Sequence, residues 1–325
     1  MSRVTILVYE GFQILDAAGP ASAFEIAGHF GAPYAVTLAA SPGGRVASSG
    51  GIAVEAVPLA DAVSCDTLLV PGGETARTRT PQPDLLHAIA EAARAGRRVA
   101  SVCSGAFVLA ASGVLDGRRA ATHWAVAAEL KRRYPLVTVD PDSIFVEDDG
   151  VWTSAGVSAG IDLALGMIRR DHGEDVARKV AQKMVVYHRR PGTQSQHSAL
   201  LDMVTPDHRF AALLTWARER LAEPLGVERL AERAGLSVRQ FTRAFTESTG
   251  LPPAKAIERL RVEAARAAIE TGATYLEEVA RRTGFGNGER MRRAFVKTTG
   301  QPPQMVRREA KRNPQPSPPA ATTPG

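Results

Sequence analysis

The chain has 325 residues, 44% of them hydrophobic and 23% charged, which is enough for two ordinary globular domains with separate cores. Its net charge of +6 is uneven: residues 208–325 contain 21 Lys and Arg against 12 Asp and Glu, and residues 1–207 contain 19 against 22. No apolar stretch approaches the roughly 18 residues of a membrane span, and residues 1–10 lack a secretory signal, so we expect a cytoplasmic protein that does not bind membranes.

Residues 1–165 alternate short β-branched runs with helical patterns. This alternation predicts βαβ units and a flavodoxin-like α/β domain, in which helices cover both faces of a parallel sheet. Strands are predicted at residues 4–9, 34–40, 67–70 and 98–103, and helices at 20–29, 84–95, 105–112, 125–133, 160–171 and 175–188.

A polar segment that contains proline follows this alternating part. Residues 189–207 begin RRPGTQSQH and end TPD, a composition that suits an interdomain linker. We therefore place one domain at residues 1–188 and a second, helical domain at residues 208–312. Residues 313–325 contain five prolines among small and polar residues and are predicted to be a disordered tail.

Two similar segments lie about fifty residues apart in the second domain. The first, LAERAGLSVRQFTRAF at residues 230–245, precedes TGLPP, and the second, VARRTGFGNGERMRRAF at residues 279–295, precedes TGQPP. Each predicts a short helix, a turn that begins at Gly235 or Gly284, and a second helix with apolar residues at helical spacing. Ser237 is placed to cap the second helix of the first segment. The pattern predicts two helix-turn-helix units.

The second helix of each unit presents side chains of types that pair with base edges and phosphates in a major groove. Residues 253–270 predict one long amphipathic helix, a rigid spacer between the two recognition helices. Because the second recognition helix begins at Gly286-Asn-Gly288, we expect it to anchor phosphates more than it reads bases. The predicted DNA-contacting residues are Ser237, Val238, Arg239, Gln240, Thr242, Arg243, Asn287, Glu289, Arg290, Arg292 and Arg293.

With these landmarks, residues 210–308 resemble the AraC/XylS family of transcription regulators. The resemblance includes RLR at residues 259–261 and GQPP at residues 300–303, with Met291 in place of the family's usual aromatic residue. It implies sequence-specific binding to double-stranded promoter or operator DNA. The alternatives are a helical domain whose basic surface is merely solvated, and an architectural protein that binds DNA regardless of sequence.

The chain has two cysteines, Cys65 and Cys103, too few for a disulfide framework or a thiolate metal site, and we expect no metal and no cofactor. Cys103 ends a predicted strand and precedes small residues and a helix, the arrangement of a nucleophile elbow. That turn would place it at the carboxyl edge of the sheet, where open α/β folds bind ligands, beside a helix end that favours a thiolate or an anionic ligand. Gly73 and Ser104 are candidate N–H donors of an oxyanion site.

Residues 1–188 resemble the PfpI-type branch of the class I glutamine amidotransferase-like superfamily. The motifs are GFQILDAAGP (11–20), PGG (71–73), SVCSGA (101–106), LDGR (115–118), THW (122–124) and TSAGVSAGID (153–162). Hydrolytic members commonly have histidine directly after the cysteine, where this chain has Ser104, which argues against peptidase chemistry. Asp16 resembles the carboxylate of isocyanide hydratase-type members. His123 is a further candidate base, although a histidine beside tryptophan is more often a packed residue.

The joining of the two domains resembles the GlxA family of transcription regulators over nearly the whole chain. It implies a non-catalytic amidotransferase-like domain that senses a small metabolite, often a nitrogenous one, with RNA polymerase and a second copy of the chain as further partners. The alternative is a hydratase or amidase that uses Cys103 and carries a fused DNA-binding domain. The candidate catalytic residues are Cys103, Asp16 and His123, and the predicted ligand-binding residues are Asp16, Gly72, Gly73, Cys103, Ser104, His123, Ser154 and Gly156.

Overall fold

The computed structural model describes residues 1–62, 64–186, 192, 196, 203, 210–270, 273 and 275–312, with side chains of the last helix to residue 308. The chain forms two compact units, Met1–Gln196 and His197–Gly325. Most of the predicted linker at 189–207 and all of the predicted tail at 313–325 lie outside the described residues. The domain boundaries at residues 188 and 208 therefore stay predictions.

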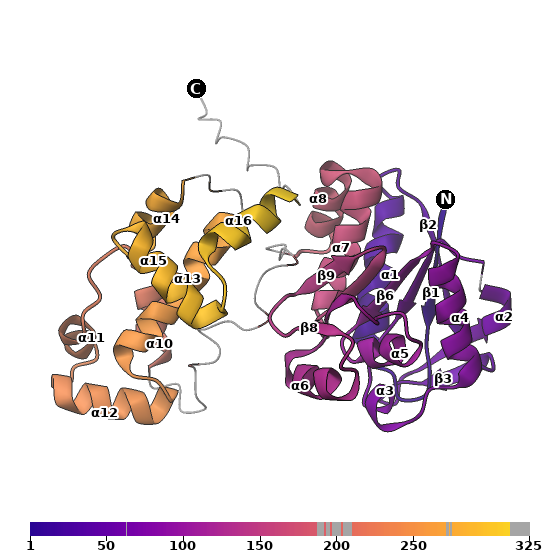
Figure 1. The fold of residues 1–325 in the computed structure, drawn as a ribbon, viewed down its shortest axis with the longest axis horizontal. Helices are drawn as coiled ribbons and strands as arrows, with labels where there is room; N and C mark the ends of the chain where they lie inside the picture. Colours follow the sequence, from indigo (N-terminus) through magenta and orange to yellow (C-terminus); the bar gives the residue numbers. More distant parts are fainter. Residues whose placement is uncertain are drawn as a thin grey trace. The chain divides into compact units, whose positions relative to one another are not determined.

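The first unit is built on a mostly parallel β-sheet. The strands are β1 (Ser2–Leu7), β2 (Tyr34–Ala40), β3 (Gly44–Ala47), β4 (Ala53–Pro58), β5 (Thr67–Val70), β6 (Arg98–Val102), β7 (Arg119–Ala121), β8 (Thr138–Asp140), β9 (Phe145–Asp148) and β10 (Val151–Ser154). Eight of them form one sheet in the order β3-β4-β2-β1-β5-β6-β10-β9. Figure 1 shows the first unit, with β1, β2, β3, β6 and β9 among its labelled strands. The strands from β4 to β10 in this order run parallel, and β3 and β9 add an antiparallel strand at each edge. A separate parallel pair is formed by β7 and β8.

Helices cover both faces of this sheet, which confirms the predicted flavodoxin-like α/β fold. They are α1 (Ile14–Gly28), α2 (Leu59–Ala62), α3 (Thr75–Thr78), α4 (Pro83–Arg94), α5 (Gly105–Ala111), α6 (Trp124–Arg133), α7 (Ala159–His172) and α8 (Glu174–Lys183). On one face, Phe24 of α1 and residues of α7 and α8 share a core with Ile6 of β1. On the other face, Ile89 of α4 and Phe107 of α5 share a core with Leu7. Successive residues of a strand point to opposite faces, so β1 contributes to both cores.

The first helix begins earlier than predicted, at Ile14 instead of Pro20. Gln13 caps it, because the Gln13 Oε1 atom accepts a hydrogen bond from the Leu15 N–H (2.6 Å). Proline lacks the N–H that a helix interior uses, which is why the sequence favoured Pro20 as a first residue. Instead, Pro20 is buried inside α1. The earlier start places Asp16 in the first turn of α1.

The second unit is helical. Its helices are α10 (Ala211–Arg218), α11 (Val227–Arg233), α12 (Val238–Thr249), α13 (Pro253–Glu270), α14 (Leu276–Arg282), α15 (Gly288–Thr299) and α16 (Pro303–Arg312). Two hydrophobic clusters share α13: Leu260 packs with Phe241 of α12 in one, and Ile269 packs with Phe295 of α15 in the other. Both predicted helix-turn-helix pairs, α11–α12 and α14–α15, are present, and α13 has the predicted bounds of the spacer. None of the helices in the described part of the chain has the length and hydropathy of a membrane span.

The two turns need glycine for different reasons. Gly235 has a φ of 66° and Gly284 a φ of 81°, a region that other residues enter only at a cost. A Cβ atom on Gly235 would meet nothing within 4 Å. On Gly284 it would lie 1.8 Å from the carbonyl oxygen of Leu221 and 2.7 Å from Arg261 Nε. The second turn is therefore pressed against the backbone just after α10.

We expect Gly284→Ala to destabilise the second unit more than Gly235→Ala. Both substitutions place a side chain at positive φ, which costs about 1–2 kcal/mol, but only the first also forces a methyl group into a backbone oxygen. Hydrogen–deuterium exchange over α13 to α15 in the full chain measures the difference, and equal protection in the two variants would contradict the close approach at Gly284.

Candidate functional site

The predicted ligand site lies at the carboxyl edge of the sheet in the first unit. Asp16 comes after β1, Gly72 after β5, Cys103 after β6 and Gly156 after β10. These four strands are neighbours in the sheet and run parallel, so their carboxyl ends meet at one edge. Such an edge is where open α/β folds bind ligands, at the point where the strand order reverses.

Cys103 occupies the predicted tight turn between β6 and α5. Its φ is 58°, which a residue other than glycine adopts only where the surroundings hold it. The Cys103 N–H donates to the carbonyl oxygens of Ser154 (3.1 Å) and Ala155 (3.2 Å). The carbonyl oxygen of Cys103 accepts a hydrogen bond from Thr122 Oγ1 (2.8 Å). These contacts hold the half-buried thiol at the edge of the sheet.

Asp16 is fully buried beside this thiol. Its carboxylate accepts hydrogen bonds from the N–H groups of Gly72 and Val157, both at 2.9 Å. Burial raises the pKa of Asp16 to about 6, although the two N–H donors favour the charged form. The carboxylate thus ties α1 to the loops that follow β5 and β10.

The thiol of Cys103 stays protonated at neutral pH. Burial, and after it the negative charge of Asp16, raises the pKa of Cys103 to about 12. The N–H of Ser104, at the start of α5, acts in the opposite direction but is the smaller effect. The sequence favoured a thiolate at this helix end, and the structure differs because burial beside a carboxylate outweighs the helix end.

Two glycines keep side chains away from the thiol. A Cβ atom on Gly72 would lie 2.6 Å from Cys103 Cβ, and one on Gly156 would lie 2.8 Å from Cys103 Sγ and 2.6 Å from His123 Cδ2. His123 therefore shares the space next to Gly156 with the thiol. The Nδ1 atom of His123 accepts a hydrogen bond from the Ala125 N–H (3.2 Å) and caps α6.

Gly73 and Ser154 are bonded to partners other than the thiol, and Ser104 bonds Gly73 as well as the thiol. The Gly73 N–H donates to Ser104 Oγ (2.9 Å), and Ser104 Oγ donates to the Gly73 carbonyl oxygen (2.8 Å). The Gly73 N–H is thereby engaged, which corrects its expected place as an oxyanion donor. Ser154 Oγ donates to the carbonyl oxygen of Ala155 (3.1 Å). The residues that converge on the thiol are Asp16, Gly72, His123 and Gly156, with the backbone N–H and the hydroxyl of Ser104.

Further residues contribute to the site beyond the ligand-binding residues named from the sequence. Val157 supplies an N–H to Asp16, and Thr122 fixes the carbonyl of Cys103. Both lie within quoted motifs, so the sequence carried a signal for them. Gln196 comes from the predicted linker and had no such signal.

Gln196 bonds to both neighbours of His123. Its Nε2 donates to the carbonyl oxygen of Thr122 (2.8 Å), and its Oε1 accepts from the Trp124 N–H (2.9 Å). Its backbone N–H donates to the carbonyl oxygen of Asp142 (2.7 Å). A residue of the predicted linker is thus pinned to the segment that borders the thiol.

In the second unit, α12 separates a buried face from an exposed one. Phe241 and Phe245 are buried, whereas Val238, Arg239 and Arg243 are exposed and Thr242 is half-buried. Regular 3.6-residue spacing produces this division.

Two of the predicted DNA-contacting residues, Ser237 and Gln240, cap the start of α12. Ser237 Oγ accepts a hydrogen bond from the Gln240 N–H (3.4 Å), which confirms the predicted cap, and Gln240 Oε1 accepts one from the Ser237 N–H (3.3 Å). This reciprocal pair is a capping box. The amide oxygen of Gln240 is therefore engaged at the start of the helix.

On α15, two predicted contacts are likewise engaged. Asn287 Oδ1 accepts a hydrogen bond from the Arg290 N–H (2.9 Å) and caps the helix. Glu289 pairs with Arg292 (2.8 Å) and lies 3.9 Å from Arg293. Met291 is buried in the core, as expected for a residue that replaces an aromatic one.

The profile of the DJ-1/PfpI family matches residues 2–170, and a helix-turn-helix domain profile matches residues 230–309. The HTH-type transcriptional regulator GlxA of Rhizobium meliloti (strain 1021) is 30% identical over 316 residues, which cover 95% of this chain and 97% of GlxA. The isonitrile hydratase of Pseudomonas putida is 34% identical over 170 residues, 52% of this chain and 69% of the hydratase. An AraC family transcriptional regulator from Pseudomonas putida superposes with a TM-score of 0.53 at 27% identity, over 57% of this chain and 100% of that one.

We expect Asp16→Asn to speed the reaction of Cys103 with iodoacetamide at pH 8, because the neutral amide removes a charge that raises the pKa of the thiol. The wild-type thiol should react far more slowly than free cysteine. Mass spectrometry of the peptide that contains Cys103, in a Cys65→Ser background, gives both rates. A wild-type rate equal to that of free cysteine would contradict the protonated thiol.

Proposed function

The chain belongs to the DJ-1/PfpI family, in the branch that carries an AraC-type helix-turn-helix domain, and we propose that its first unit senses a small polar metabolite that changes how the second unit binds DNA. Relatives with both domains are transcription regulators, and this chain is a regulator of that kind. The observation that carries the sensor proposal is the protonated Cys103 thiol against the buried carboxylate of Asp16.

A working cysteine nucleophile is a thiolate, and this site disfavours one. A pKa of about 12 leaves very little thiolate at neutral pH. His123, the candidate base, uses Nδ1 to cap α6. The site instead offers a carboxylate, a thiol and an imidazole to a ligand, and a cationic or N–H-bearing ligand would stabilise the ionised form of Asp16. This chemistry supports a nitrogenous effector.

Gln196 supports a route from this site toward the second unit. It bonds both Thr122 and Trp124, the residues on either side of His123, and Thr122 in turn bonds the carbonyl oxygen of Cys103. A ligand that moves His123 would strain these hydrogen bonds. Gln196, which belongs to the predicted linker, would then change its position. Coupling of this kind requires the ligand to prefer one of two arrangements.

The exposed face of α12 supports base reading by the first helix-turn-helix unit. Arg239 and Arg243 are one turn apart and can reach guanine edges, and Val238 can contact a thymine methyl group. On α15, Asn287 caps the helix and Glu289 pairs with Arg292, which leaves Arg290 and the more loosely paired Arg293 for phosphate contacts. A homodimer would present two reader domains to one operator, and RNA polymerase would be the further partner in activation.

A second candidate function is hydration of an isonitrile by the first unit. The likeness to the isonitrile hydratase and the position of Asp16 next to Cys103 favour it. In such a reaction Asp16 would accept the proton of an attacking group, for which a pKa of about 6 is suitable.

We expect Arg239→Ala to weaken binding to the operator by about 1–3 kcal/mol and to relax discrimination at one base pair. Fluorescence anisotropy with duplexes from upstream of the chain's own gene, and with single base-pair changes in them, measures both effects. Arg281→Ala, which removes an exposed arginine of α14, is the matched control. Equal weakening on unrelated duplexes would indicate architectural binding.

For the sensor, we expect the wild-type protein to consume an alkyl isonitrile no faster than Cys103→Ala does, because the thiol is protonated. Cys103→Ala should also keep the wild-type affinity for DNA. Turnover that is present in the wild type and lost in Cys103→Ala would instead establish the hydratase function.

A further inference from the structure

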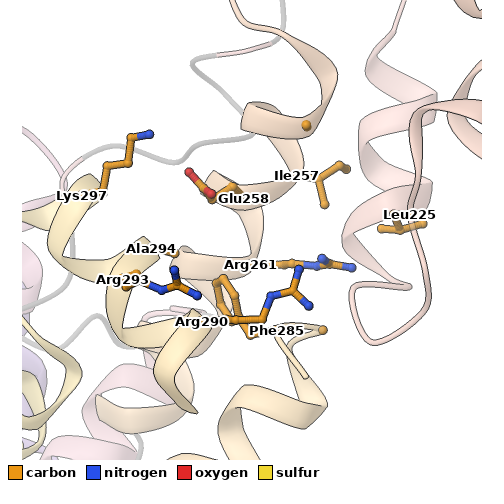
Figure 2. Close-up of a pocket in the computed structure, with 11 residues that line it drawn as sticks. Leu225, Ile257, Glu258, Arg261, Phe285, Arg290, Arg293, Ala294 and Lys297 are labelled. Atoms are coloured by element: carbon orange, nitrogen blue, oxygen red, sulfur yellow. The ribbon is translucent and has the colours of Figure 1, made fainter. Parts of the chain in front are cut away.

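A pocket of about 400 Å³ opens between α13 and α15 in the second unit. Glu258 and Arg261 line it from α13, and Arg290, Arg293 and Lys297 line it from α15 (Figure 2). The residues of α15 are spaced by three and four, so they share one face of the helix. Arg292 is not on this face and does not line the pocket.

The pocket has an excess of positive charge. Four of its side chains are cationic, and its one carboxylate, Glu258, already pairs with Lys255 at 2.6 Å. Within the described residues of the chain, Arg261 and Arg290 have no carboxylate within ion-pair distance. Arg293 is 3.9 Å from Glu289, which makes a shorter pair with Arg292.

The cations repel one another. The pKa of Arg261 is lowered by burial and then by the charge of Arg290. The pKa of Lys297 is lowered by a hydrogen bond to Lys255 and then by the charge of that lysine, against the opposing effect of Glu258. Holding like charges together disfavours the folded chain, and a bound anion would remove that cost.

Arg261 is held in place before any anion arrives. Its Nε donates to the carbonyl oxygen of Leu221 (3.2 Å) and its terminal nitrogen to that of Glu223 (2.9 Å). The turn at Gly284 packs against the same guanidinium, where a Cβ atom would lie 2.7 Å from Nε. An arginine on a solvated surface loses side-chain entropy when it binds an anion. Arg261 is already ordered, so most of that entropic cost is absent when an anion binds.

We propose that this pocket is a phosphate site in which Arg290, Arg293 and Lys297 bind the oxygens and Arg261 supplies fixed positive charge behind them. The phosphate can belong to the backbone of bound DNA or to a free phosphorylated metabolite. Because Arg290 and Arg293 lie on the second recognition helix, the DNA source rests on the proposed function. Neither Arg261 nor Lys297 was among the predicted DNA-contacting residues.

The DNA source is tested by the salt dependence of binding in the full chain. Each phosphate contact adds about 0.9 to the slope of log K against log salt concentration. We expect Lys297→Gln to make this slope shallower by about that amount and Glu258→Gln, which adds net positive charge, to tighten binding. Arg259→Gln removes an exposed charge of α13 that does not line the pocket and is the control, with an unchanged slope.

The free source is tested by calorimetric titration of the DNA-free protein with inorganic pyrophosphate. Saturable binding that Lys297→Gln abolishes, with an unchanged DNA slope, would support the pocket and assign it to a metabolite. An unchanged slope together with no pyrophosphate binding would overturn the proposal. A wild-type protein that binds no DNA would defeat the proposed function alone, and the pyrophosphate titration would still decide the pocket.

Discussion

The arrangement of the first unit depends on the buried carboxylate of Asp16. A carboxylate removed from water is costly unless hydrogen bonds replace its hydration. Here the N–H groups of Gly72 and Val157 replace that hydration, and they come from the loops that follow β5 and β10. The requirement fixes both loops against α1, and the same loops form the walls around Cys103. The position of the thiol therefore depends on Asp16 as well as on the backbone hydrogen bonds of Cys103.

The same carboxylate changes what the thiol can do. A cysteine in a tight turn at the start of a helix would ordinarily favour a reactive thiolate. Here burial and the negative charge of Asp16 raise the pKa of Cys103, so the thiol stays protonated. In the second unit the imbalance has the opposite sign, because Arg261 and Arg290 are held together with no carboxylate between them among the described residues. In each unit the uncompensated charge indicates what would bind there. The carboxylate of Asp16 favours a cationic or N–H-bearing ligand, and the arginines of the second unit favour an anion.

Regular patterns allowed much of this to be predicted. The spacer helix at 253–270 has its predicted bounds, since a proline begins it and its apolar spacing is unbroken. The turns at Gly235 and Gly284 and the cap at Ser237 also follow from local rules. Local patterns did not single out the strands β3, β4 and β7 to β10, because these lack the uninterrupted apolar run that marks the equally short β5. Local rules failed at Pro20, because burial inside α1 tolerates a proline that propensity alone would place first.

The sequence by itself determined the two folds, the elbow at Cys103 and the helices that carry the DNA-contacting residues, because periodicity, glycine and capping residues act over a few positions. Only the tertiary structure decided how the side chains are used. It turned Gln240 and Asn287 onto their own helices, engaged the N–H of Gly73, pinned Gln196 beside His123 and gathered Arg261 with Lys297. These outcomes depend on which distant residues come into contact and on how far burial shifts each charge, and neither quantity is contained in local spacing.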